Sequence, residues 1–378
     1  MKKKTQVAIF MATMTMQVQS MEIFEPEQVT EVCSDLYFKS KYVFCTGKQQ
    51  GKTATIDKVY FNDTKPKDRE TLLNLTLIFE PKEEHELIIE PRALSELINE
   101  KVHLELYLRN VRLKNLDYLF YNSRALTYIK LEEIKGNLTS MTSMCSGCIN
   151  LKNIDVGTLN TSHIKTMDRA FFDCTALKKV NLNNLDTSKV RTMKEMFANC
   201  DSLKSLGIDK IDTSRVQNMD GMFYGCAKVE KLDISNLNTK LLQTAEKLCA
   251  GCSSLKSIKL GQKDFSNMQN ASRLFENCPK LQWLDLSKIK FKNKTYTDNF
   301  IRNCESLMSV KYHPASRKKM KYSEKQCEGL TSLNKKRKRT RSVDLMQPDA
   351  EKFEANDNES KDSQIEDKKE LESDSDEV

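Results

Sequence analysis

Cysteine has the most regular spacing in this chain, and its thiol could form disulfides or bind a metal ion. Seven of the twelve cysteines follow each other at intervals of 26 residues: Cys148, Cys174, Cys200, Cys226, Cys252, Cys278 and Cys304. A fixed period of this length is typical of a solenoid, in which equivalent residues stack in a column. A buried free cysteine packs well in such a column as a small apolar side chain. We therefore predict a structural column of thiols; disulfides between its members are the alternative, which a reducing compartment would disfavour.

Two further cysteines create the spacing of zinc ligands, in the pairs Cys145-x-x-Cys148 and Cys249-x-x-Cys252. The pairs are four repeats apart, which is about 20 Å if each stacked strand adds about 4.8 Å. One tetrahedral ion cannot bridge that distance. We interpret Cys145 and Cys249 as packing residues, and we predict no metal site and no other cofactor.

Other residues with catalytic potential do not form a recognisable group. Gly47 to Thr53 imitates a phosphate-binding loop, but it has three residues between its glycines where the loop needs four. A polar hairpin turn is the simpler interpretation. The histidines are scattered, and the repeat brings none of them beside a serine or cysteine nucleophile. The sequence therefore predicts a protein that is not an enzyme.

The elements that position these residues are read from one repeat, between Cys174 and Cys200. Val180 and Leu182 alternate with polar residues, which indicates a short strand with one buried face. Asp186-Thr187-Ser188 can turn the chain or cap a helix. Four apolar residues then follow at steps of three, one and three, the spacing of one helix face. They are Met193, Met196, Phe197 and Cys200.

Each unit is therefore predicted to be strand, turn and helix, and the fold class is an α/β solenoid of the leucine-rich-repeat kind. We expect the solenoid over residues 102–312, after a small α+β head or cap at 21–101. Residues 1–20 are a candidate signal peptide or a flexible N-terminus. Residues 313–341 form a basic linker, and 342–378 an acidic tail predicted to be disordered.

The repeats also resemble a known family. The string D-T-S…M-x-x-M-F-x-x-C occurs in register from Asp186 to Cys200 and from Asp212 to Cys226. It is similar to the repeat of the BspA-like leucine-rich repeat family, over roughly residues 119 to 312. The resemblance implies a non-catalytic adhesion or interaction protein that is displayed on the cell surface or secreted.

Charge is distributed unevenly around a net value of +8. Residues 311–341 carry 12 basic side chains, and residues 342–378 carry 14 acidic ones. The densest basic cluster comprises Lys335, Lys336, Arg337, Lys338, Arg339 and Arg341. It could be a nuclear localisation signal, a patch for nucleic acid or an anionic surface, or a solvated linker. Ser373 and Ser375 lie among acidic residues and are candidate phosphorylation sites. No apolar stretch is long enough for a transmembrane helix.

A leucine-rich solenoid presents a row of outward side chains on its concave strand ladder, and such faces bind partners. The outward positions are Asn153, Asp155, Lys179, Asn181, Ser205, Lys231, Asp233, Ser257, Lys259, Trp283 and Asp285. We predict that an unidentified protein ligand binds there. Trp283 is either a binding hot spot or a packing residue for the C-terminal cap. The alternative function is an intracellular or nuclear scaffold that associates with nucleic acid through residues 311–341.

Overall fold

The structure is a computed structural model, and thirteen strands and one short helix are defined in the part of the chain that it describes. The described residues are 43–50, 53–61, 73–79, 86–90, 92–97, 102–156, 159–182, 185–204, 208, 210–291 and 294–316. The strands are β1 Val43–Gln50, β2 Thr53–Phe61, β3 Leu73–Phe79, β4 Glu86–Ile89, β5 Val102–Arg109, β6 Arg112–Leu113, β7 Leu126–Glu132, β8 Asn153–Asp155, β9 Lys179–Asn181, β10 Lys231–Asp233, β11 Ser257–Lys259, β12 Trp283–Leu286 and β13 Ser309–Tyr312. The helix is the 3₁₀ turn η1 Pro314–Ser316.

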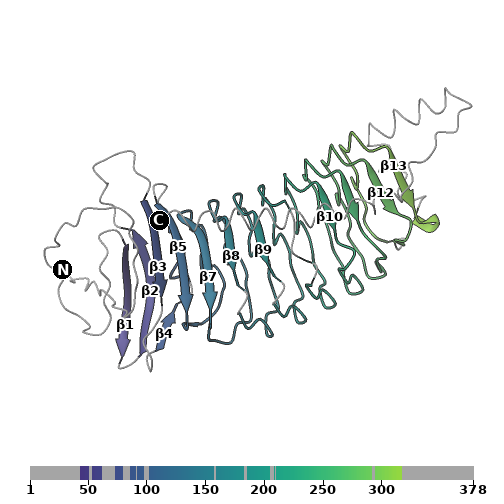
Figure 1. Cartoon of the computed structure of the whole chain (residues 1–378). Coiled ribbons are helices and arrows are strands. Elements are labelled where there is room, and N and C mark those ends of the chain that lie inside the picture. Colours follow the sequence, from purple (N-terminus) through teal and green to yellow (C-terminus); the bar gives the residue numbers. More distant parts are fainter. Residues whose placement is uncertain are drawn as a thin grey trace, which may run out of the picture. The chain divides into compact units, whose positions relative to one another are not determined.

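The chain is wound as a β-solenoid of about 8 turns with a repeat of ~25 residues. Parallel strands follow one another in the orders β3-β5-β7-β8-β9 and β10-β11-β12-β13, one strand from each coil. Figure 1 shows these strands side by side along the stack. A third sheet, β1-β2-β4-β6, begins with an antiparallel hairpin and continues with parallel pairs. The sequence Gly47 to Thr53 lies in this hairpin, where Gln50 pairs with Thr53.

A second line of pairing runs along another side of each coil. It consists of isolated parallel bridges that join Ser140, Thr166, Thr192, Asn218, Thr244, Asn270 and Tyr296 in succession. Coils are therefore hydrogen-bonded to their neighbours along this line as well as along the strands. Because both lines repeat in the same register, a 26-residue sequence repeat becomes a stack of superimposed coils.

The predicted helix in each unit is wrong. Residues 194–199 form consecutive turns, and η1 is the only helix among the described residues. An α-helix needs every N–H to bond the carbonyl four residues earlier. Here the N–H of Met196 bonds the carbonyl of Met193, and the N–H of Phe197 bonds Met222 of the next coil at 2.9 Å. In residues 193–200, every second backbone N–H group thus bonds a carbonyl of the next coil.

Left-handed residues explain how these turns imitate a helix in the sequence. Glu195 has φ 53° and Asn199 has φ 59°, and each belongs to a column of residues with positive φ. One column is Arg92, Tyr118, Ser143, Arg169, Glu195, Gly221, Lys247, Arg273 and Asn299; the other is Glu96, Asn122, Gly147, Asp173, Asn199, Gly225, Gly251, Asn277 and Asn303. A left-handed residue at every fourth position interrupts the right-handed turns. The side chains of Met193, Met196 and Phe197 still point into the core, so their spacing in the sequence matches that of a helix face.

The interior is a continuous apolar core made of columns. Met193, Met196 and Phe197 are buried, as are their counterparts in other coils. The rings of Phe171 and Phe197 stack with centroids 5.5 Å apart, and Phe197 stacks on Phe223 at 6.2 Å. Burial of these apolar side chains between coils supplies the main driving force for stacking.

The stack already begins inside the range 21–101, for which a separate α+β head or cap was predicted. Strands β1, β2, β3 and β4 all lie within this range. Strand β3 pairs in parallel with β5 along its whole length, and both left-handed columns start at Arg92 and Glu96. The described residues of this range form strands and turns, without a helix.

Residues 1–20, the basic cluster at 335–341 and the acidic tail lie outside the described residues. The predictions made for them stay predictions. Within the described part of the chain, no helix has the length and apolar character needed to cross a bilayer.

Candidate binding surface on the strand face

The strand alternation places two columns of side chains on the outside of the stack. In β10, Leu232 is buried whereas Lys231 and Asp233 are exposed. The parallel register then aligns equivalent outward residues of successive coils. We call these two columns the strand face. Its first column contains Tyr128, Asn153, Lys179, Lys231, Ser257, Trp283 and Ser309; its second contains Tyr107, Lys130, Asp155, Asn181, Asp233, Lys259, Asp285 and Lys311.

Ten of the eleven predicted binding residues lie on these strands. Asn153, Asp155, Lys179 and Asn181 belong to β8 and β9, and the other six belong to β10, β11 and β12. The side chains of Lys179 and Asn181 are not described, and Ser205 lies outside the described residues. Trp283 is half-buried and pairs through its backbone with Ser257 and Ser309.

Opposite charges neighbour each other across the coils on this face. The ammonium group of Lys259 lies 3.2 Å from the carboxylate of Asp233, and both side chains are well exposed. Ser235 donates to Asp233 through its hydroxyl at 2.6 Å and its N–H at 2.8 Å. Partial burial disfavours the charged carboxylate, but these hydrogen bonds and Lys259 hold the pKa of Asp233 below its usual value. The carboxylate therefore stays ionised at neutral pH.

The strand face also contains an aromatic and charged group that the sequence analysis did not include. The rings of Tyr107 and Tyr128 lie 5.5 Å apart between centroids. Burial and the charge of Glu105 raise the pKa of Tyr107 to about 12. Its hydroxyl donates to Glu105 Oε2 at 3.3 Å. The alternation of β5 and β7 is visible in the sequence, but the predicted outward residues begin at Asn153 in β8, two coils after Tyr107.

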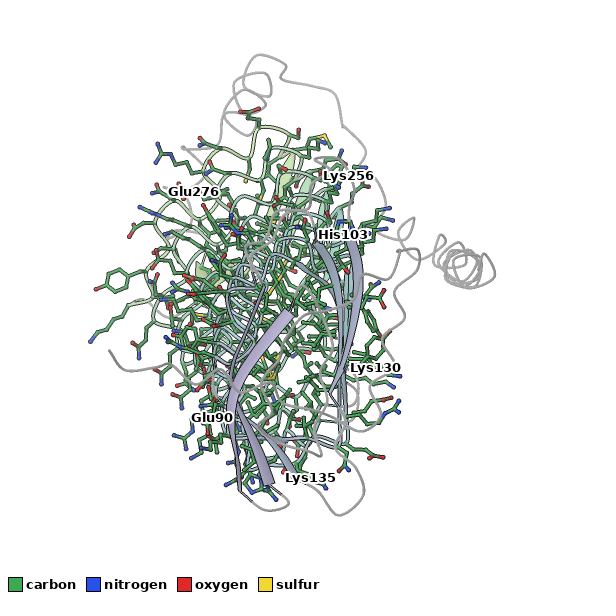
Figure 2. The ribbon with its side chains drawn as sticks, turned by 90° about the vertical axis from the view of Figure 1, so that its left-hand side faces the viewer. Glu90, His103, Lys130, Lys135, Lys256 and Glu276 are labelled. Atoms are coloured by element: carbon green, nitrogen blue, oxygen red, sulfur yellow. The ribbon has the colours of Figure 1, made fainter. Side chains whose placement is uncertain are left out.

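Charged side chains surround the two tyrosines. Glu132 accepts from Arg109 and from Lys130, each at 2.8 Å. These hydrogen bonds lower the pKa of Glu132. Figure 2 views the molecule from the end that carries β1 and labels Lys130 on the strand face. The first coils therefore present two half-buried aromatic rings inside a border of paired charges.

The cysteine column lies in the interior and is hydrogen-bonded. The nine cysteines from Cys145 to Cys304 are free and buried. The thiol of each column member donates to a backbone carbonyl of the preceding coil, for example Cys200 Sγ to Phe171 O at 3.1 Å and Cys226 Sγ to Phe197 O at 3.2 Å. Burial raises the pKa of the Cys200 and Cys226 thiols, so these two stay protonated and are poor nucleophiles.

Cys145 and Cys249 occupy the phenylalanine column, at the positions of Phe171 and Phe223 in neighbouring coils. Their carbonyl groups accept the thiols of Cys174 and Cys278, each at 3.1 Å. Among the described residues, no cluster of three or more histidine, cysteine or acidic side chains is arranged to hold a metal ion.

Sequence comparison identifies the family of this stack. Residues 114–207 and 202–312 match the family described as "Mycoplasma protein of unknown function, DUF285". The chain belongs to the DUF285 family. The two DUF285 matches together cover the coils from the end of β6 to β13. No curated protein matches the sequence.

Two solved structures are similar to this DUF285 chain at low identity. One is a leucine-rich repeat protein of T. pallidum (TpLRR), with 13% identity and a TM-score of 0.34, covering 65% of this chain and 90% of that one. The other is a leucine-rich repeat protein of Bacteroides ovatus ATCC 8483, with 16% identity and a TM-score of 0.25, covering 74% of this chain and 89% of that one.

Proposed function

We propose that this DUF285 protein is a non-catalytic binding module that holds a protein partner on its strand face. The supporting observation is the register of the outward columns, which aligns equivalent positions of successive coils from β7 to β9 and again from β10 to β13. These side chains lie outside the apolar core, so they can change without loss of the stack. Extended surfaces of this kind are used for partner binding by solenoid proteins.

Two aromatic positions are the proposed anchors of that contact. Trp283 is half-buried on one part of the face, and Tyr107 with Tyr128 forms the aromatic group on another. Tryptophan and tyrosine are enriched at binding hot spots because a large rigid ring buries much area with little entropy loss. The paired charges around them would contribute more to specificity than to affinity.

Site-specific photo-crosslinking tests the surface. A crosslinking amino acid is placed at Lys231, Lys259 or Asp285 on the strand face, and at Lys247 or Arg273 on the turns as controls. We expect one adduct of the same mass from all three strand-face positions in the native source, and its absence from the controls. Adducts of equal yield at the turn positions would contradict the proposal.

A matched pair of aromatic substitutions tests the anchor. Trp283→Ala should weaken binding of the crosslinked partner at least tenfold, as hot-spot truncations of about 2 kcal/mol or more do. Tyr296→Ala removes an aromatic ring that is 65% exposed on the other line of pairing and should leave affinity unchanged. Equal affinity of both variants would reject Trp283 as an anchor, and thermal unfolding of each variant checks that the stack is intact.

The proposed binding module could act at the cell surface or inside the cell, and these two versions of the proposal differ in where the protein is located. The BspA-like resemblance favours export and an adhesive role at the cell surface. The alternative is a nuclear or cytoplasmic scaffold, addressed by the basic cluster at 335–341. The intact mass of native protein, with and without thiol alkylation, separates them. Loss of about twenty N-terminal residues supports export; an unprocessed N-terminus with all twelve thiols open to alkylation after unfolding supports the alternative.

A further inference from the structure

The edge of the stack at which the strands begin carries a row of lysines, separate from the strand face. Lys152, Lys178, Lys204 and Lys256 occupy the same position of their coils, and all four are exposed. The coil between Lys204 and Lys256 has Glu230 at this position, with exposed Lys228 and Lys231 beside it. We call the four lysines of equivalent position the lysine row. In the view along the stack, the labels of Lys256 and His103 mark the same edge of the strands although the residues belong to coils far apart in the stack, and Lys130 lies further along the strands (Figure 2).

Backbone hydrogen bonds fix the spacing within the lysine row. The N–H of Lys178 bonds the carbonyl of Lys152 at 3.1 Å, and the N–H of Lys256 bonds that of Glu230 at 2.8 Å. Directly bonded strands lie about 4.8 Å apart. Like charges at this distance on adjacent strands are destabilising, so a row of them has an energetic cost to the isolated stack.

Among the described residues, a carboxylate pairs with only one of the four lysines of the row. Lys256 pairs with Glu230 at 2.7 Å, but no ion pair among the described residues involves Lys152, Lys178 or Lys204. The field of the row reaches His103, where burial and then the charge of Lys152 lower the imidazole pKa.

Neutral hydrogen-bonding side chains flank the row. On its strand side, Asn153 and Ser257 share their column with the basic residues Lys179 and Lys231. Asn150, Thr175 and Ser202 lie on its turn side. The amide N–H of Asn150 and the hydroxyl of Thr175 donate to carbonyls of the previous coil, which leaves their oxygen atoms to accept hydrogen bonds. Between Asn153 and Ser257 the flanking position holds no aromatic residue, so the row offers no stacking platform for nucleic-acid bases.

We propose that the lysine row binds a linear anionic polysaccharide, with its sulfate or carboxylate groups on the lysines and its hydroxyl groups on the flanking Asn, Ser and Thr side chains. Charges repeated along a rigid line match a polymer that has a charge on every unit. This proposal goes beyond the protein partner of the strand face. It shares Asn153 and Ser257 with that face, but the lysines that carry it lie outside both columns of the strand face.

Binding of a size-defined heparin oligosaccharide to the full chain tests the proposal, in about 150 mM salt to suppress weak nonspecific contacts. The row variant combines Lys152→Gln, Lys178→Gln and Lys204→Gln. The control variant removes the same charge from another exposed region, with Lys165→Gln, Lys189→Gln and Arg215→Gln. A third variant removes the basic cluster at 335–341.

We expect the row variant to bind at least about tenfold more weakly, because each lost contact is worth on the order of 1 kcal/mol in water. The control variant should change affinity less than twofold, and replacing the three lysines by arginine should restore binding. Equal loss in the control variant, or loss only when the cluster at 335–341 is removed, overturns the proposal.

Two competing ligands decide the class of polyanion. Single-stranded DNA of equal charge and phosphatidylserine vesicles are measured with the same variants. We expect both to bind more weakly than the oligosaccharide and to respond equally to the row and control variants. Tighter binding of either one, lost specifically in the row variant, would overturn the polysaccharide as the ligand.

Discussion

The cysteine column acts as a set of hydrogen-bond donors as well as a set of small packing residues. Ser123 shows this, because it occupies the column position one coil before Cys148. Its hydroxyl donates to Leu94 O at 2.8 Å, just as the thiol of Cys148 donates to Phe120 O at 2.9 Å. The property shared by serine and cysteine is the donor. A carbonyl in the turn of each coil is thereby satisfied by the next coil.

This interpretation predicts the order of stability of two substitutions at Cys200. Cys200→Ser should be more stable than Cys200→Ala by on the order of 1 kcal/mol, because serine still donates to Phe171 O. If the thiol only filled space, the order would reverse, since burial of an unneeded hydroxyl is costly. Urea unfolding of both variants measures the difference, and Ser123→Ala serves as the control, with a loss of similar size.

Lys263 is a buried amine in a column of aliphatic residues. It takes the place that Leu185, Ile211, Leu237 and Ile289 have in other coils, and it is 5% exposed. Its amino group donates to Ser235 O at 2.9 Å and Leu237 O at 2.5 Å. Burial lowers the pKa of Lys263 to about 8, with the charge of Asp233 opposing the shift. Two acceptors suit a neutral amine, which has two protons to donate.

Stability should therefore depend on the protonation of Lys263. The pKa of Lys263 is about 8 in the folded protein and 10.5 for an unperturbed lysine, which represents the unfolded chain. Between pH 8 and 10.5 the unfolded chain therefore binds more protons than the folded protein, so the free energy of unfolding rises with pH. Lys263→Leu should stabilise the protein at pH 7 by ~1 to 4 kcal/mol.

The advantage of this variant should shrink as pH rises through that window. Urea unfolding of the two proteins at several pH values measures the gap, with the exposed Lys288→Leu as the control. A gap that does not change between pH 8 and 10.5 would mean that the pKa of Lys263 is not lowered by folding.

In each coil, a series of turns occupies the segment for which a helix was predicted. The residues with positive φ explain the difference. The predicted helix was inferred from apolar spacing alone, and that spacing is shared by a chain of turns that bends every fourth residue. Gly221 and Gly225 stand at two left-handed positions, with φ 59° and 70°. Glycine is favoured there because it has no Cβ to clash. Glycine in a helix interior would instead be unfavourable.

Substitution of Lys247, which has φ 57°, distinguishes the two local structures by sign. Lys247→Gly should be more stable than Lys247→Ala by roughly 1 kcal/mol, because alanine pays the left-handed penalty and glycine does not. In a helix the order would be opposite and of similar size. Thermal unfolding measures the difference. Lys240, which has no positive φ, is the control, where alanine should be the more stable of the two.

The whole molecule behaves as a stack of equivalent coils, so its stability is expected to be a sum over coils and their interfaces. Each coil contributes one strand position, one bridge position and two left-handed turns in fixed register. Removing one complete coil preserves every column, whereas removing half a coil shifts all of them.

Deletion of residues 226–251 should therefore give a folded protein, with Cys252 taking the place of Cys226. We expect one cooperative thermal transition at a lower temperature than in the full chain. Deletion of residues 226–238 should abolish that transition, because apolar and polar positions exchange places. If both deletions unfold the protein equally, the coils are not equivalent units.

The sequence by itself determined the period, the columns and the strand positions of this DUF285 protein. Cysteine and phenylalanine recur at one interval, and alternation around Leu232 or Leu284 identifies inward and outward sides without coordinates. Most of the candidate strand face followed from that alternation. Strands are readable in this way because their two-residue period depends only on local geometry.

Only the tertiary structure decided between turn and helix, joined the N-terminal strands to the stack and revealed the lysine row as a line. These features depend on hydrogen bonds between residues about 26 positions apart, such as Phe197 to Met222 or Lys178 to Lys152. The apolar spacing of residues 193–200 fits both local structures. The choice between them was made by the neighbouring coil, which supplies the acceptors that half of the backbone N–H groups use.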